Sequence, residues 1–79
     1  MTRLPAITHR EVIKAARKLG FLKDHQRGSH LVMRNPQNKL RVVIPIHAGR
    51  TLKKGTLKGI LQDLEISTKD FVKLLKTKK

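Results

Sequence analysis

The sequence contains no cysteine, no tryptophan and no tyrosine. Without cysteine it has neither disulfide bonds nor thiolate metal ligands, which is compatible with a reducing compartment. No apolar run approaches the length of a membrane span or a signal-peptide core, so we expect a soluble cytoplasmic protein with no membrane partner. Its 79 residues predict a single domain over 1–79, with a lead-in over 1–7 and a basic tail over 76–79.

Acidic residues are also scarce. Five Asp and Glu stand against nineteen Lys and Arg, which gives a formal net charge of +14. Such an excess predicts a polyanionic partner, and nucleic acid is favoured over a membrane surface because the apolar stripes are needed for the core. The two aromatic residues, Phe21 and Phe71, fall at apolar-periodic positions. Base stacking is therefore disfavoured, and phosphate contact with recognition of shape remains.

Three helices are predicted from their ends and their apolar spacing. Thr8 and Glu11 have the spacing of a capping box, and Gly20 can take the left-handed conformation that often ends a helix. Leucine and isoleucine recur at helical spacing in a second helix that begins at Gly55. Ser67 is placed to cap a third helix.

Three strands are predicted between the first two helices. Phe21 and Leu22 are expected to form the buried end of the first strand, and Pro45 to close the third. A turn over Asn35–Asn38 joins the last two strands. The predicted strands are Phe21–Gln26, His30–Arg34 and Lys39–Ile44. This order predicts an α+β domain, α-β-β-β-α-α, with a three-stranded antiparallel sheet and helices on one face.

Alternation divides the side chains of the last two strands between two faces. The face expected to pack inward holds Leu31, Met33, Leu40, Val42 and Ile44. The opposite face holds His30, Val32, Arg34, Arg41 and Val43. We expect this second face to be open and basic, with His30 at its edge.

The candidate catalytic segment is Arg27-Gly28-Ser29-His30. Imidazole has an ordinary pKa near neutral, so a backbone-held histidine flanked by cations suits proton transfer on a bound anion. The alternative is that His30 is merely a polar residue on a half-exposed strand. Ser29 is a poor nucleophile candidate, because neighbouring strand residues point to opposite faces and no acid is placed to orient His30.

Neither a metal site nor another cofactor is expected. Metal-assisted nucleases need clustered carboxylates, whereas the acids here are few, and the four histidines lack close ligand spacing. RNA carries its own nucleophile, the ribose 2′-OH, so one general base and a few cations would suffice. If this protein is a nuclease, we therefore expect RNA as its substrate.

Ile46–Lys54 is predicted to be a basic loop. It leads into free helical N–H groups near Gly55 and Thr56, which predict an anion site; a solvated basic turn is the alternative. His47 lies in this loop, where it could act as a general acid, a phosphate ligand or a hydrogen-bond donor that stabilises the loop. We favour a supporting role over a catalytic one.

Several segments, taken together, resemble the HicA toxins of bacterial toxin–antitoxin modules. They run in the family's order and spacing from about residue 8 to residue 76: Gly20-Phe21, Arg27-Gly28-Ser29-His30, Ile44-Pro45-Ile46-His47, Lys53-Lys54-Gly55-Thr56-Leu57, and Ile66-Ser67 with Phe71. Many members carry a second histidine or an aromatic residue at the position of Leu31, and a glycine at that of Glu65. The first departure leaves His30 as the candidate in its turn, and the second indicates a strained or rearranged helix end.

The resemblance implies a double-stranded-RNA-binding-domain-like fold, mRNA cleavage that inhibits translation and growth, a catalytic histidine at His30, and neutralisation by a HicB antitoxin. We expect that acidic antitoxin to cover His30 and to contact Arg34 or Arg41. The predicted supporting or RNA-binding residues are Arg27, Gly28, Ser29, Arg34, Arg41, His47, Lys53 and Lys54. The alternatives are a non-catalytic RNA-binding module and a small ribosome-associated protein.

Overall fold

The computed structural model describes residues 6–47 and 49–76. Its elements are α1 (His9–Lys18), β1 (Leu22–Arg27), β2 (His30–Arg34), β3 (Arg41–Pro45), α2 (Lys54–Leu64) and α3 (Thr68–Lys76). The predicted α-β-β-β-α-α order is therefore confirmed. Residues 1–5 of the predicted lead-in over 1–7, and residues 77–79 of the predicted tail over 76–79, lie outside the described residues. None of the described helices is long and apolar enough to span a bilayer.

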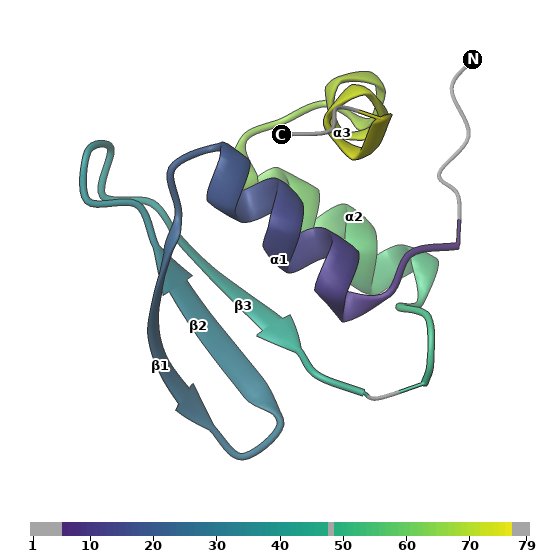
Figure 1. Cartoon of the computed structure of the whole chain (residues 1–79), viewed down its shortest axis with the longest axis horizontal. Helices are drawn as coiled ribbons and strands as arrows, with labels where there is room; N and C mark the ends of the chain where they lie inside the picture. Colours follow the sequence, from purple (N-terminus) through teal and green to yellow (C-terminus); the bar gives the residue numbers. More distant parts are fainter. Residues whose placement is uncertain (1–5, 48, 77–79) are drawn as a thin grey trace.

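The sheet is antiparallel in the order β1-β2-β3, and the helices lie on one side of it (Figure 1). This is the arrangement that the resemblance implied. The predicted inward face packs into the core, which α1, α2 and Phe71 of α3 complete. Arg34 and Arg41 are exposed on the opposite face, as predicted. Val32 lies on that face too, but on the central strand, where only 7% of it is exposed.

The ends of α1 follow from local chemistry. The Thr8 side chain accepts from the Glu11 N–H and the Glu11 carboxylate accepts from the Thr8 N–H, which confirms the capping box. At the other end Gly20 has φ 99°, and its N–H donates to the Arg17 carbonyl. The Phe21 N–H donates to the Ala16 carbonyl, which completes a Schellman motif.

Asn35 fastens this helix end to the β2–β3 turn. Its amide Nδ2 donates to the Leu19 carbonyl at 3.1 Å, and its Oδ1 accepts from the Gln37 N–H at 2.9 Å. Only 4% of the residue is exposed, and both groups are satisfied, so its burial is compatible with the core. A Cβ on Gly20 would lie 3.2 Å from Asn35 Nδ2, so this close approach also favours glycine.

Two strand predictions are wrong in detail. Leu22 is not buried with Phe21, since 60% of Leu22 is exposed; alternation sends Phe21 into the core and Leu22 to the open face. The third strand begins at Arg41, not at Lys39, because Lys39 has φ 66° and its N–H donates to the Asn35 carbonyl, which continues the turn.

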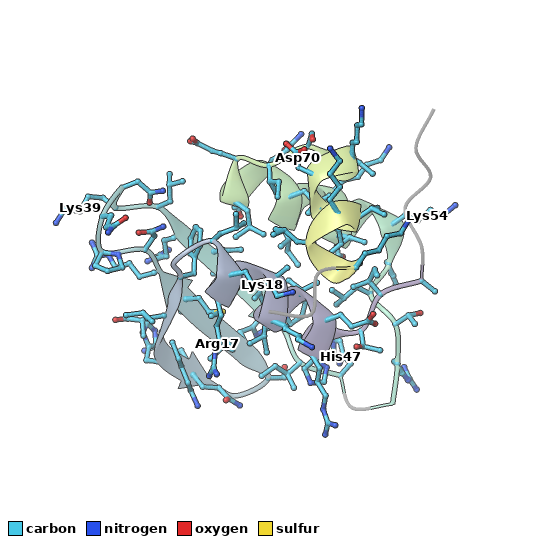
Figure 2. The ribbon with its side chains drawn as sticks, turned by 45° about the horizontal axis from the view of Figure 1, so that its top comes forward. Arg17, Lys18, Lys39, His47, Lys54 and Asp70 are labelled. Atoms are coloured by element: carbon cyan, nitrogen blue, oxygen red, sulfur yellow. The ribbon has the colours of Figure 1, made fainter. Side chains whose placement is uncertain are left out.

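The third helix joins the domain through both ends. The Ser67 hydroxyl accepts from the Asp70 N–H at 3.1 Å, which confirms the predicted cap. Near the opposite end, Lys18 Nζ of α1, labelled in Figure 2, donates to the Leu74 carbonyl at 2.9 Å. Phe71 is fully buried between these two attachments.

Glu65 ends α2 in a conformation that favours glycine. Its φ is 56°, its N–H donates to the Gln62 carbonyl, and the Ile66 N–H donates to the Leu61 carbonyl. These bonds repeat the pattern at the end of α1, where the corresponding residue is Gly20. The strained helix end indicated by the family pattern is therefore present, because a side chain with a Cβ occupies the left-handed position.

Glu65→Gly should raise the free energy of unfolding by about 1 kcal/mol, because relief of left-handed strain outweighs the added entropy of the unfolded chain. Urea titration followed by circular dichroism measures it. Glu65→Ala is the matched control, since it removes the carboxylate but keeps the Cβ. Equal stabilities of the glycine and alanine variants would show that the left-handed residue is not strained.

Candidate active site

The β1–β2 hairpin presents His30 at the first position of β2. Its two-residue loop is Gly28-Ser29, and Gly28 has φ 58°. Two-residue hairpin loops need positive φ values, which glycine supplies without strain. A Cβ on Gly28 would meet nothing within 4 Å, so conformation and not space calls for glycine here. Arg27 and His30 face each other across the end of the ladder.

His30 is held between two strands. It pairs with Pro45 of β3, and the Ile46 N–H next to this pair donates to the Ser29 carbonyl at 2.6 Å. This makes His30–Pro45 a non-hydrogen-bonded pair, in which side chains lie closest and no backbone hydrogen bond joins the two residues. Because proline has no N–H to donate, Pro45 fits this position without loss of a ladder hydrogen bond. It extends β3 one residue beyond the predicted end.

A pocket of about 650 Å³ opens beside His30. Its walls come from the end of the sheet, the β3–α2 loop and the first turn of α2: His30, Val43, Pro45, His47, Arg50, Thr51, Leu52, Lys53 and Thr56. Two imidazoles, two long cationic side chains and two hydroxyl groups are thus gathered around one volume. No acidic residue is among these lining residues, so the pocket suits an anion.

The basic loop is attached to the start of α1. Thr51 forms an isolated antiparallel bridge with Thr8, and the Leu52 N–H donates to the Ile7 carbonyl at 2.7 Å. Within the loop, the Arg50 N–H donates to the His47 carbonyl at 3.1 Å. These bonds return the chain toward His30 after it leaves β3, so residues distant in sequence share the pocket.

The start of α2 adds a second source of positive potential. Lys53 is the N-cap residue, its side chain makes no capping bond, and the first turn contains no acid. The backbone N–H groups at this terminus therefore lack a carboxylate or hydroxyl acceptor from a cap. Thr56 of this turn lines the pocket, so the helix dipole adds to the charge of Lys53.

The imidazole of His30 is exposed and makes no hydrogen bond within the described ranges. It is thus accessible to a ligand in the pocket. Elsewhere on the hairpin, His25 Nδ1 lies 2.7 Å from Asp24 Oδ2, and both side chains are about half exposed. Within residues 6–47 and 49–76, no three His, Asp or Glu side chains come close enough to hold a metal ion.

The structure brings together only part of the predicted set. His30, His47 and Lys53 line the pocket, and Arg27, Gly28 and Ser29 form the adjoining turn. Lys54 is not a lining residue, and Figure 2 shows it well apart from His47. Arg34 and Arg41 pair with each other at the far end of the ladder.

Three polar lining residues were not among the predicted site residues: Arg50, Thr51 and Thr56. Arg50 and Thr56 carried a signal, since one is a cation of the basic loop and the other opens the second helix. Thr51 carried none, because its place depends on the bridge to Thr8.

This fold and pocket define a small, strongly basic α+β domain with a histidine-containing pocket that no acidic residue lines. A family model described as the HicA toxin of bacterial toxin-antitoxin matches residues 9–66, which is well over half of the chain. The chain therefore belongs to the HicA toxin family: it is a toxin of a toxin–antitoxin module, with an antitoxin as its partner. No curated protein matches it.

Lys53→Gln should weaken binding of single-stranded RNA and reduce the slope of log K against log salt by about 0.7, the loss of one phosphate contact. The substitution should not destabilise the start of α2, because a cation at a helix N-terminus interacts unfavourably with the helix dipole and its removal ends that interaction. Fluorescence anisotropy measures the binding, in a His30→Ala background so that the candidate catalytic residue is absent from both proteins compared. The matched control is Lys69→Gln, at an exposed residue of α3. Equal salt slopes for the two variants would contradict a phosphate contact at Lys53.

Proposed function

We propose that this toxin is a metal-independent endoribonuclease that cleaves mRNA and thereby inhibits translation and growth. The observation that supports this most directly is the pocket itself. It combines an accessible imidazole, His30, with Arg50, Lys53 and the free start of α2, and no acid lines it. A phosphodiester is the natural anionic occupant of such a pocket in a domain with a net charge of +14.

The proposed reaction uses the ribose 2′-OH as its nucleophile. The neutral imidazole of His30 accepts the 2′-OH proton while O2′ forms a bond to phosphorus. The bond from phosphorus to the 5′-oxygen breaks, and that oxygen takes up a proton from solvent, while the imidazolium of His30 returns its proton to solvent. The products are a 2′,3′-cyclic phosphate and a 5′-hydroxyl, so atoms and charge balance without a metal or a water nucleophile.

The cations of the pocket have a separate task. Negative charge increases on the non-bridging oxygens as O2′ attacks, and fixed donors that face those oxygens stabilise the transition state. We assign this role to Arg50, Lys53 and the N–H groups of the first turn of α2, because these residues line the pocket or border it. His47 lines the same pocket, and we assign it phosphate binding in support of His30.

The same geometry supports a proposal for how the toxin is neutralised. The pocket lies at one end of the open sheet face, and the described helices leave that face uncovered (Figure 1). An acidic antitoxin of the HicB type laid across this face would cover His30 and exclude RNA by occupancy. Opposite net charges would also accelerate its association.

His30→Ala should reduce the rate of RNA cleavage by about 10²- to 10⁴-fold, the usual effect of removing a general base. The fold should persist, because His30 is exposed and outside the core. Single-turnover cleavage of a defined RNA measures the chemical step. His47→Ala is the matched control and should mainly weaken RNA binding.

Two results would contradict this assignment. One is a folded His30→Ala protein that cleaves at the wild-type rate, which would remove His30 from the reaction. The other is a His47→Ala protein with unchanged RNA affinity and a larger loss of rate than His30→Ala, which would transfer the acid–base role to His47.

A further inference from the structure

The end of the open face opposite His30 has a different chemistry from the pocket. Leu22 pairs with Arg34, and Arg34 pairs with Arg41, so these three residues form one row across the sheet. Arg34 lies four residues along β2 from His30, about 13 Å at the usual rise of a strand. This end of the face is therefore outside the catalytic pocket.

The two arginines form an unfavourable pair in the free protein. The Asn35 N–H donates to the Leu40 carbonyl next to them, so Arg34 and Arg41 are a non-hydrogen-bonded pair, the type with the closest side chains. Like charges in direct opposition destabilise a sheet. Neither arginine forms an ion pair with a carboxylate in the described part of the chain. An external carboxylate placed on this pair would relieve the repulsion.

A hollow of about 220 Å³ lies beside this row, lined by Leu22, Lys23, Asp24, Arg34 and Pro36. Leu22 is 60% exposed, the most exposed large apolar side chain of the described residues, and Val43 on the same face is 36% exposed. Leu22 and Pro36 give the hollow an apolar part, and Arg34 and Lys23 give it cationic sides. Asp24, the acid among the lining residues, lies 2.7 Å from His25 Nδ1.

This combination fits a protein more closely than RNA. The sugar–phosphate backbone offers nothing to an exposed leucine, and no aromatic side chain lies here for a base to stack on. An apolar side chain beside a carboxylate satisfies both parts, because the arginine fork matches a carboxylate in a bidentate manner. Arginine is also enriched among the few residues that dominate the binding energy of an interface.

We propose that the antitoxin anchors on this row, with an apolar side chain in the Leu22–Pro36 hollow and a carboxylate on Arg34 and Arg41. The proposal rests on the proposed function in one respect, namely that the antitoxin then extends along the open face to cover the His30 pocket. Recognition of the antitoxin and cleavage of RNA thus depend on different residues. A toxin that escapes its antitoxin while retaining full activity is the expected consequence.

The test measures the affinity of the full-length toxin for the antitoxin of its module by titration calorimetry. Leu22→Asp should weaken binding by about 30-fold, because it removes the apolar contact and adds repulsion from an acidic partner. Leu22→Met is the conservative control and should bind within about threefold of wild type. RNA cleavage by Leu22→Asp alone should equal that of the wild type, and added antitoxin should fail to stop it at concentrations that silence the wild type.

A second pair of variants tests the charged half of the row. Arg34→Glu should weaken antitoxin binding by at least as much as Leu22→Asp. Lys14→Glu, on the exposed side of α1, changes the net charge equally and should slow association without a comparable loss of affinity. Two results would overturn the proposal. The first is that Leu22→Asp binds the antitoxin with wild-type affinity. The second is that Leu22→Asp and Arg34→Glu lose more affinity for RNA than for the antitoxin, which would assign the row to RNA.

These results separate the two proposals. Binding of the antitoxin is measured directly, so a wild-type protein that binds it through Leu22 but never cuts RNA would contradict the ribonuclease and support the anchor. A protein that cuts RNA through His30 and binds the antitoxin independently of Leu22 would do the reverse.

Discussion

The register between β2 and β3 is the constraint on which the rest of this structure depends. Each residue of β2 has a defined partner on β3, from His30 with Pro45 to Arg34 with Arg41. A slip of one residue would turn Leu31 and Met33 to the open face and His30 toward the core. The turn held by Asn35 sets the register at one end, and the bond from the Ile46 N–H to the Ser29 carbonyl closes it at the other. Core packing and the position of the candidate catalytic residue therefore have one origin.

Features determined by short-range chemistry could be predicted from the sequence. The capping box at Thr8, the left-handed Gly20 and the cap at Ser67 each depend on residues within a few positions of one another. The two faces of β2 and β3 followed from alternation. The prediction for Leu22 was wrong because two adjacent apolar residues fit either face, and only the pairing of β1 with β2 decides between them.

The pocket could be predicted only in part, for a related physical reason. His30 and the cationic loop were evident as separate segments, but their convergence depends on backbone bonds from Thr51 and Leu52 to the chain before α1. Those bonds join main-chain groups and do not require particular residue types, so the sequence does not reveal them. The contribution of Thr51 was accordingly invisible in the sequence, whereas His47 and Lys53 were found through their chemistry.

In the two proposals above, the surplus of positive charge would serve two purposes on one small domain. Around His30 the cations surround an accessible imidazole without any acid, which suits a phosphodiester; around Arg34 they accompany exposed apolar side chains, which suit a protein. One sheet face can thus present a substrate site and a recognition site about 13 Å apart on the same strand.

We propose that His30 deprotonates a ribose 2′-OH in this pocket. The chemical nature of the cut RNA ends is the most direct test of that reaction. A synthetic RNA cleaved by the purified toxin in the presence of EDTA can be analysed by mass spectrometry. Attack by the 2′-OH would leave a 2′,3′-cyclic phosphate, or the 3′-phosphate formed from it, on one fragment and a 5′-hydroxyl on the other. Fragments that end in a 3′-hydroxyl and a 5′-phosphate would contradict it, because they require water and not the 2′-OH as the nucleophile.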